Sequence, residues 1–148
     1  MKCVILSVGK EKDGMTDEVI STYTGRILRY MPFEWHIVAP CATKEKEGEK
    51  LLSIIKKEDY VVLLDGKGSE LKSEALAELI ENRMVDGIRR LVFVIGGPYG
   101  ASENLYKRAN YVWRISALTF PHMLMRVIVA EQIYRALTIL KNEPYHHA

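Results

Sequence analysis

Apolar residues along the chain are grouped in short runs, and in the segments between these runs apolar residues are spaced differently. The runs at residues 2–8, 60–64 and 91–95 contain almost no polar residue, which is typical of parallel strands buried on both faces. Residues 33–38 alternate between apolar and polar side chains and predict a strand nearer the edge of a sheet. Residues 111–115 predict the last strand.

Between these runs, apolar residues recur at helical spacing. The pattern predicts helices from Thr16 or Asp17 to Tyr30, over residues 51–55, from Ser73 to Gly87, over residues 102–109, and from Pro121 to Lys141. Charged residues at 10–13 and 43–50 predict solvated loops, with a first helical turn as the alternative for the second stretch. Because strands and helices alternate throughout, the predicted fold class is α/β, with a mostly parallel sheet and helices on both faces. Without a linker or an internal repeat, we expect a single domain over residues 1–148.

Two helices have apolar faces that must be covered. In the helix that follows Ser73, we expect Leu76, Leu79, Ile80 and Val85 to point inward. The final helix is apolar on nearly every side, so one face should pack on its own sheet and another on a second copy of the protein. The sequence therefore predicts a homodimer.

Composition narrows the class of protein. Hydrophobic residues make up 48% and charged residues 27% of the 148 positions, as in a folded globular protein. No apolar run approaches the roughly 18 residues of a membrane span, and the N-terminus lacks the pattern of a signal peptide. Cys3 and Cys41 form no CxxC pair and are interpreted as free thiols in a reducing, cytoplasmic environment. The net charge of +2 argues neither for nor against a nucleic-acid partner.

The strand at residues 91–95 ends abruptly in a glycine-rich turn. Gly96, Gly97 and Gly100 allow another group to approach the main chain closely, and Ser102 can cap the helix that follows. On these glycines alone, an ordinary turn between a strand and a helix is favoured over a ligand loop.

Other chemistry is sparse. The four histidines have no metal-ligand spacing, so we expect no metal site. Glu131 is expected to pair with Arg135 one helical turn later, and His122 to form a hydrogen bond at the start of the final helix. The carboxyl ends of parallel strands form the usual binding edge of such a sheet. The loops at residues 64–68, 96–100 and 116–120 therefore predict one ligand cleft.

Five segments resemble a known family. They are VGK at residues 8–10, LDGKGSELKSEALA at 64–77, FVIGGPYG at 93–100, ISALTFPHMLMRVIVAEQIYRA at 115–136 and NEPYHHA at 142–148. In order and spacing they are similar to the ribosomal RNA large subunit methyltransferase H family. That family belongs to the SPOUT class of enzymes, which carry a C-terminal trefoil knot. The knot is implied by this resemblance alone.

The resemblance implies a reaction and a methyl donor. Members of the family methylate N3 of a pseudouridine in 23S rRNA on the assembled ribosome, as homodimers, with S-adenosylmethionine as donor and without a metal. By the family pattern, the donor would be held by Leu64, Gly97, Ile115, Ser116, Ala117, Leu118, Thr119 and Phe120. We expect Gly97 to leave room for this ligand against the main chain.

The resemblance also suggests residues for RNA and for catalysis. His146 is the candidate base for the N3 proton, or a group that orients the target base, and Tyr145 could stack on RNA. Arg126, Arg114 and Lys107 are candidates for phosphate contacts, although each has an ordinary ion pair as its alternative. The family usually has lysine at the position of Ser69 and a basic residue at that of His147, and both differences concern RNA contacts rather than the donor loops.

Two other functions stay open. A SPOUT methyltransferase of this shape could act on another RNA such as tRNA, and the tail around Tyr145 argues against that. The chain could also be a ribosome-binding module without catalysis, and the intact loops at 96–100 and 115–120 argue against that.

Overall fold

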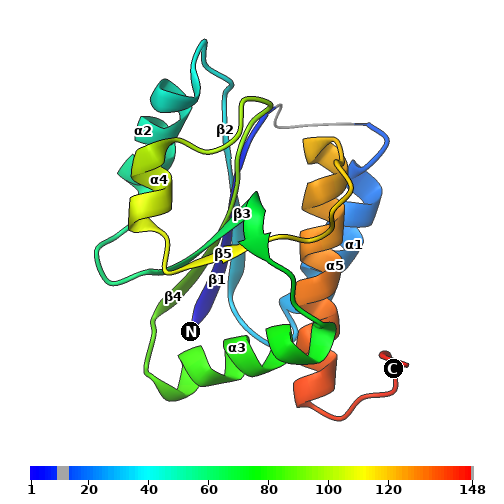
Figure 1. Cartoon of the computed structure of the whole chain (residues 1–148). Helices are drawn as coiled ribbons and strands as arrows, with labels where there is room; N and C mark the ends of the chain where they lie inside the picture. Colours follow the sequence, from blue (N-terminus) through cyan, green and yellow to red (C-terminus); the bar gives the residue numbers. More distant parts are fainter. Residues whose placement is uncertain (10–13, 148) are drawn as a thin grey trace.

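The computed structural model describes residues 1–9 and 14–147. The strands are β1 (Lys2–Val8), β2 (Phe33–Val38), β3 (Tyr60–Ser69), β4 (Arg90–Ile95) and β5 (Tyr111–Trp113). They form one sheet in the order β2–β1–β4–β3–β5, and all neighbouring strands are parallel (Figure 1). The helices are α1 (Asp17–Ile27), α2 (Lys44–Ile54), α3 (Ser73–Val85), α4 (Glu103–Arg108) and α5 (His122–Leu140). The predicted α/β class and the position of β2 at a sheet edge are confirmed. The knot stays a prediction.

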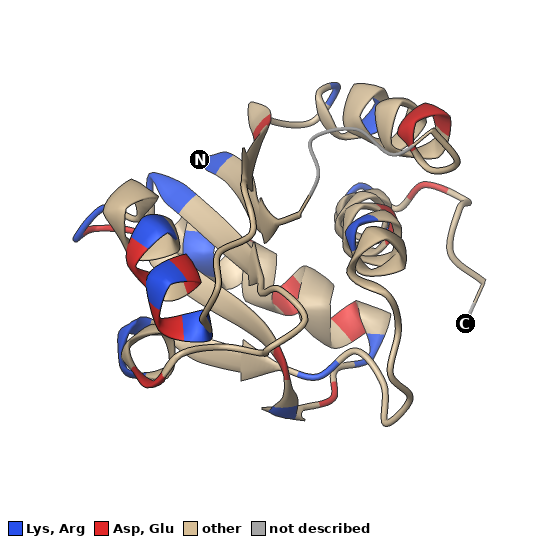
Figure 2. Ribbon diagram, turned by 90° about the horizontal axis from the view of Figure 1, so that it is seen from above, with Lys and Arg blue, Asp and Glu red and all other residues tan. Residues whose placement is uncertain are grey.

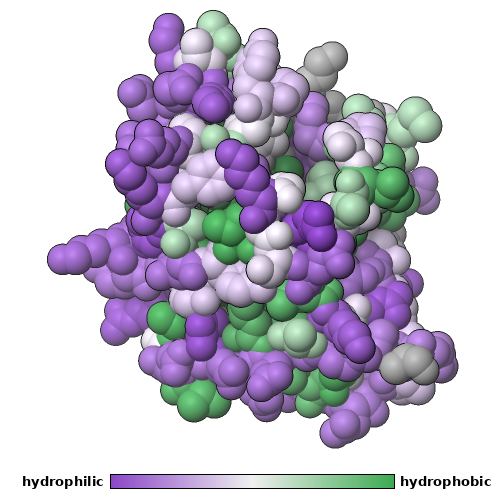
Figure 3. Space-filling model, in the orientation of Figure 1, coloured by the Kyte–Doolittle hydropathy of each residue, from purple (hydrophilic) through white to green (hydrophobic). Residues whose placement is uncertain are grey.

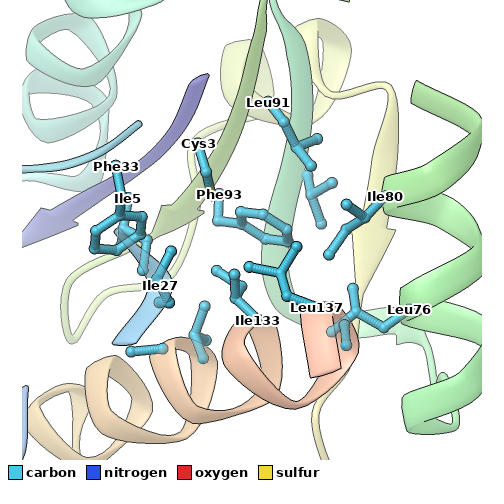
Figure 4. Packing of buried hydrophobic residues seen from close by; sticks show 14 of the residues in the cluster. Cys3, Ile5, Ile27, Phe33, Leu76, Ile80, Leu91, Phe93, Ile133 and Leu137 are labelled. Atoms are coloured by element: carbon cyan, nitrogen blue, oxygen red, sulfur yellow. The ribbon is translucent and has the colours of Figure 1, made fainter. Parts of the chain in front are cut away.

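Helices cover both faces of the sheet. One core lies between the sheet and α1, α3 and α5, and the other lies under α2 and α4. In the first core, Ile5, Phe93 and Ile133 are fully buried, and Figure 4 shows them meeting between the strands and α5. Burial of each such side chain stabilises the fold by about 1.5–3 kcal/mol. Seen from above, the helices that cover the second core carry charges of both signs on their outer sides (Figure 2).

The charged run at residues 43–50 belongs to a helix. Thr43 caps α2 by accepting a hydrogen bond from the backbone N–H of Lys46 at 3.2 Å. The alternative of a helical turn in this stretch is thus confirmed. The helix α2 begins at Lys44, earlier than the helix expected at residues 51–55, and part of the charged run is buried. Glu47 and Gly48 are buried, because this part of α2 packs against the loop that follows β4. The other charged stretch, residues 10–13, lies outside the described residues, as does Ala148 at the end of the tail.

Strand β3 continues through the glycines that were expected to form its exit loop. Ser69 pairs with Trp113 after an irregularity in register, and its carbonyl accepts the backbone N–H of Arg114 at 3.0 Å. A Cβ at Gly68 would collide with the backbone carbonyl of Val112. The glycine is therefore needed for two strands to approach each other, and β5 ends at Trp113 rather than at the predicted residue 115.

The helix ends also differ from the sequence expectations. α1 ends at Ile27 rather than Tyr30, and Pro121 precedes α5 rather than lying in its first turn. Val85 was expected to point inward, but its side chain is 81% exposed, because it lies in the last turn of α3 beyond the edge of the core. The expected end of this helix is confirmed by Gly87, which follows it with a φ of 77°.

Apolar residues also remain on the surface. Met15, Val19 and Leu28 from the α1 region are exposed, as is Leu124 in the first turn of α5. Figure 3 shows apolar surface gathered where α1 and the start of α5 lie. The buried face of α5 packs on the sheet and on α1 and α3. The predicted second partner for this helix stays a prediction.

Candidate functional site

The carboxyl ends of three strands meet the start of α5 around a cavity of about 590 Å³. The register brings these ends together, because Leu64 of β3 lies beside Ile95 of β4 on one side and Trp113 of β5 on the other. Seven of the residues expected to hold the donor line this cavity: Leu64, Gly97, Ile115, Ser116, Leu118, Thr119 and Phe120. Ala117, the eighth, lies in the same loop and is exposed. The three predicted loops therefore form one cleft.

The glycine loop is closed by its own backbone. The N–H of Gly100 donates to the carbonyl of Gly97 at 3.1 Å, and Gly100 has a φ of 81°, which favours glycine. Ser102 then caps α4 as expected, because its Oγ accepts the backbone N–H of Leu105 at 3.3 Å. Tyr99 projects from the tip of this turn and is exposed.

Gly97 is closely surrounded by protein atoms on the side where a Cβ would lie, and its expected role beside the ligand stays a prediction. A Cβ there would lie 2.7 Å from Oε1 of Glu47 and 3.1 Å from Cγ1 of Val8. Both atoms lie behind the loop rather than among the residues that line the cavity. Gly97 therefore provides space for α2 and β1, and its own backbone is what faces the cleft.

The third loop has an internal hydrogen bond as well. The Oγ of Ser116 accepts the backbone N–H of Leu118 at 3.0 Å, and Leu118 is 71% exposed. His122 and Met125, at the start of α5, complete the wall. The Trp113 side chain also lines the cavity, and its Nε1 is buried without a hydrogen-bond partner among the described residues.

The tail lies at the other end of α5 (Figure 1). The Nδ1 of His146 lies 3.1 Å from Nη1 of Arg135, which is 13 positions after His122 along the helix. At about 1.5 Å per residue this places His146 roughly 20 Å from the cavity wall. The structure therefore does not bring His146 and Tyr145 to the cavity of their own chain.

Tyr145 is packed into a polar and aromatic cluster. Its hydroxyl donates to Oε1 of Glu131 at 3.0 Å and lies 3.4 Å from the hydroxyl of Tyr23, and its ring packs edge-on against Tyr134. Burial raises the pKa of Tyr145, and so do the hydrogen bonds of its hydroxyl with Tyr23 and Glu131. Glu131 also forms the expected ion pair with Arg135 at 2.6 Å, which raises the pKa of the Arg135 guanidinium. The cluster holds the tail against α5 and α1.

Comparison with known proteins decides the family. Residues 1–146 match a family described as "Predicted SPOUT methyltransferase". The chain is 43% identical to "Ribosomal RNA large subunit methyltransferase H" of Christiangramia forsetii, with 99% of each chain covered. The protein of that name from Parabacteroides distasonis is 44% identical over the same shares, and that from Clostridium perfringens is 41% identical, again over 99% of each chain. This chain belongs to the ribosomal RNA large subunit methyltransferase H family of SPOUT methyltransferases. The resemblance inferred from its motifs is confirmed.

SPOUT methyltransferases use S-adenosylmethionine as methyl donor. No group of three or more His, Cys, Asp or Glu side chains within residues 1–9 and 14–147 is placed to hold a metal ion. In the same ranges, no helix combines the length and hydropathy that a membrane span requires.

The candidate RNA residues of this SPOUT methyltransferase lie in different surroundings. Arg114 lines the cavity and pairs with Glu70 at 3.2 Å, and Lys107 is exposed and pairs with Glu103 at 3.4 Å. Arg126 is buried, and its Nε donates to Oγ of Ser7 at 2.8 Å. The roles of all three in binding RNA stay predictions.

Sequence reasoning missed two kinds of residue at this site. Met125 lines the cavity, and its place in the recognised segment at residues 115–136 could have indicated this. Glu47 lies in a segment that carries no motif, and nothing in its charged surroundings distinguishes it from a solvated residue.

Proposed function

We propose that this protein transfers a methyl group from S-adenosylmethionine to N3 of a pseudouridine in 23S rRNA, acting on the assembled ribosome in the cytoplasm. A single observation carries the proposal. Three loops separated by up to fifty residues meet in one cavity, in a chain that matches rRNA methyltransferases over 99% of its length. We further propose that residues 1–148 form one SPOUT domain, which includes the knot.

The cavity has the size and lining that the donor requires. Its volume of about 590 Å³ lies within the range of pockets that bind small molecules and cofactors. Ile95, Trp113 and Met125 supply apolar walls, and Ser116 and Thr119 supply hydroxyls.

In this proposal the adenosine part of the donor is held by the eight family positions. Backbone groups of residues 115–120 and of Gly97 supply hydrogen bonds, and Leu64 packs against the ligand. The bound donor supplies an electrophilic methyl group on a sulfonium. The N3–carbon bond forms as the carbon–sulfur bond breaks, and the N3 proton passes to a base or to water. Positioning of the two reactants supplies much of the acceleration.

We propose that His146 takes this proton, or orients the target base, in the cavity of a second copy, with Tyr145 stacked on RNA. The distance between His146 and its own cavity supports this arrangement, as do the exposed apolar residues of α1 and α5. A homodimer would cover those residues and place each tail by its partner's cavity. Arg114 and Lys107 are then the accessible candidates for phosphate contacts. Arg126 is buried, and its hydrogen bond to Ser7 would have to break before it could contact a phosphate.

Mixed dimers test this arrangement. One subunit carries Thr119→Arg, which fills the cavity from an exposed loop position, and the other lacks residues 144–148. If each active site combines the loops of one chain with the tail of the other, one site of the mixed dimer is intact. We expect mixing to restore up to half of wild-type activity per mixed dimer, although neither parent dimer is active. Absence of any restoration would place the loops and tail in one chain.

Calorimetry with S-adenosylmethionine tests the enzyme against a ribosome-binding module without catalysis. Saturable heat of binding is expected for the enzyme, and no heat at millimolar donor would support the module. Nucleoside analysis of 23S rRNA and tRNA, from cells with and without the gene, tests the substrate. We expect one methylated pseudouridine to disappear from 23S rRNA only, and a loss confined to tRNA would favour the other RNA.

A further inference from the structure

Helix α2 places a buried carboxylate directly behind the glycine loop. This carboxylate is that of Glu47, a residue that is only 2% exposed. Its Oε2 accepts the backbone N–H of Cys41 at 3.0 Å, whereas its Oε1 is buried and has no hydrogen-bond partner among the described residues. A half-satisfied buried carboxylate is destabilising, so its presence here requires a reason other than stability.

The two ends of the loop rest on two consecutive residues of α2. Glu47 lies against Gly97, where a Cβ would be 2.7 Å from Oε1 and 3.1 Å from Oε2. Gly48 lies against Ser102, whose Oγ would collide with any Cβ at position 48. Ser102 caps α4, so the second contact fixes the point at which the loop enters that helix. Between these two contacts, the loop backbone faces the donor cavity.

We propose that Glu47 is a positioning residue for the donor loop. Its carboxylate is fixed at one oxygen by Cys41, and its other oxygen defines how far the main chain of Gly97 can move away from the cavity. The backbone groups at positions 96–100 are thereby held where they face the ligand. This inference rests on the donor binding proposed above.

Kinetics with varied donor concentration test the inference. For Glu47→Ala we expect the KM and Kd for S-adenosylmethionine to rise at least tenfold, while kcat at saturating donor changes less than threefold. Glu47→Gln keeps the shape and the acceptor for Cys41, so it should restore both constants to within threefold of wild type. Glu49→Ala is the matched control, because Glu49 is exposed on the same helix. A Glu47→Ala protein with wild-type KM and Kd would overturn the inference.

Three more variants keep the test decisive if Glu47→Ala does not fold. Glu47→Asp retains the charge but withdraws it from Gly97, and should show the same tenfold rise in KM. Gly97→Ala places a methyl group against the carboxylate, and adding Glu47→Ala removes the clash. The double variant should regain thermal stability without regaining donor affinity. Full recovery of affinity would mean that Glu47 is only a steric neighbour. Failure of the wild-type protein itself to bind donor would instead overturn the proposed function.

Discussion

The imidazole of His146 is held from both sides, and Nε2 lies 2.7 Å from Oε1 of Glu74 at the start of α3. Its Nδ1 faces Arg135 in α5 at 3.1 Å. Glu74 and His146 are 72 residues apart, so this contact joins the end of the chain to the body of the fold. The described part of the tail is therefore anchored to α3 and α5 through this histidine, and one of these two contacts must open before His146 can accept a proton.

The tail should matter for transfer and not for donor binding. Removal of residues 144–148 leaves the donor cavity intact, so the Kd for S-adenosylmethionine should stay within about twofold of wild type. Methyl transfer to ribosomes should fall by about a hundredfold or more, in the range typical of a lost acid–base group. His146→Ala should reproduce most of that loss. A truncated protein with full activity would show that the tail is dispensable.

The carboxyl group of Glu74 should titrate at an unusually low pH. Its hydrogen bond with His146 is the main cause that lowers its pKa. Because the pKa is lowered in the folded state, the contact stabilises the tail above the ordinary carboxyl pKa of about 4.3 and is lost as the pH falls through the lowered value. NMR titration of the Glu74 side chain should give a midpoint below 4.3. In His146→Ala the midpoint should move upward, and an unchanged midpoint would argue against the contact.

The two cysteines should differ in reactivity. Cys3 is buried in β1, and burial raises the pKa of its thiol, whereas Cys41 is partly exposed. Since the thiolate is the reactive form, only Cys41 should react quickly with a disulfide reagent in the native protein. Unfolding in guanidinium should release the second thiol, and Cys41→Ser should abolish the fast reaction. Two fast thiols in the native protein would contradict the buried position of β1.

Phe93 should be among the most costly core positions to truncate. It is fully buried in β4 and packs edge-on against Trp113, with 6.1 Å between ring centroids. Phe93→Ala should lower the free energy of unfolding by about 3–5 kcal/mol. Val85→Ala is the control, because an exposed side chain should change that free energy by less than about 0.5 kcal/mol. Chemical denaturation measures both, and equal effects would mean that the core lies elsewhere.

Periodicity predicted most of the fold because it reports local burial. The almost entirely apolar run at Lys2–Val8 became β1 with the predicted bounds, and the alternation at Phe33–Val38 became the edge strand β2. Val85 continues the helical pattern of α3 but lies at its last position, where the side chain is exposed. A pattern along one helix cannot indicate where the neighbouring layer stops.

The site was predictable where motifs carried it and not where distant segments meet. Leu64 and residues 115–120 were placed by resemblance, and the topology brings them together. The sequence predicted room for the ligand beside Gly97, but it gave no sign that Glu47, fifty positions earlier, lies on the side where a Cβ would be. A glycine indicates that something approaches the main chain closely, but the tertiary packing decides what that neighbour is.

Methylation of ribosomes in vitro tests the central claim most directly. Ribosomes from cells that lack the gene are incubated with this protein and S-adenosylmethionine carrying a labelled methyl group, and the 23S rRNA nucleosides are analysed by mass spectrometry. We predict one labelled methyl group on N3 of one pseudouridine per ribosome, and much less label on naked 23S rRNA. No labelled pseudouridine in ribosomes, or equal labelling of naked rRNA, would contradict the proposal of a methyltransferase that acts on the assembled ribosome.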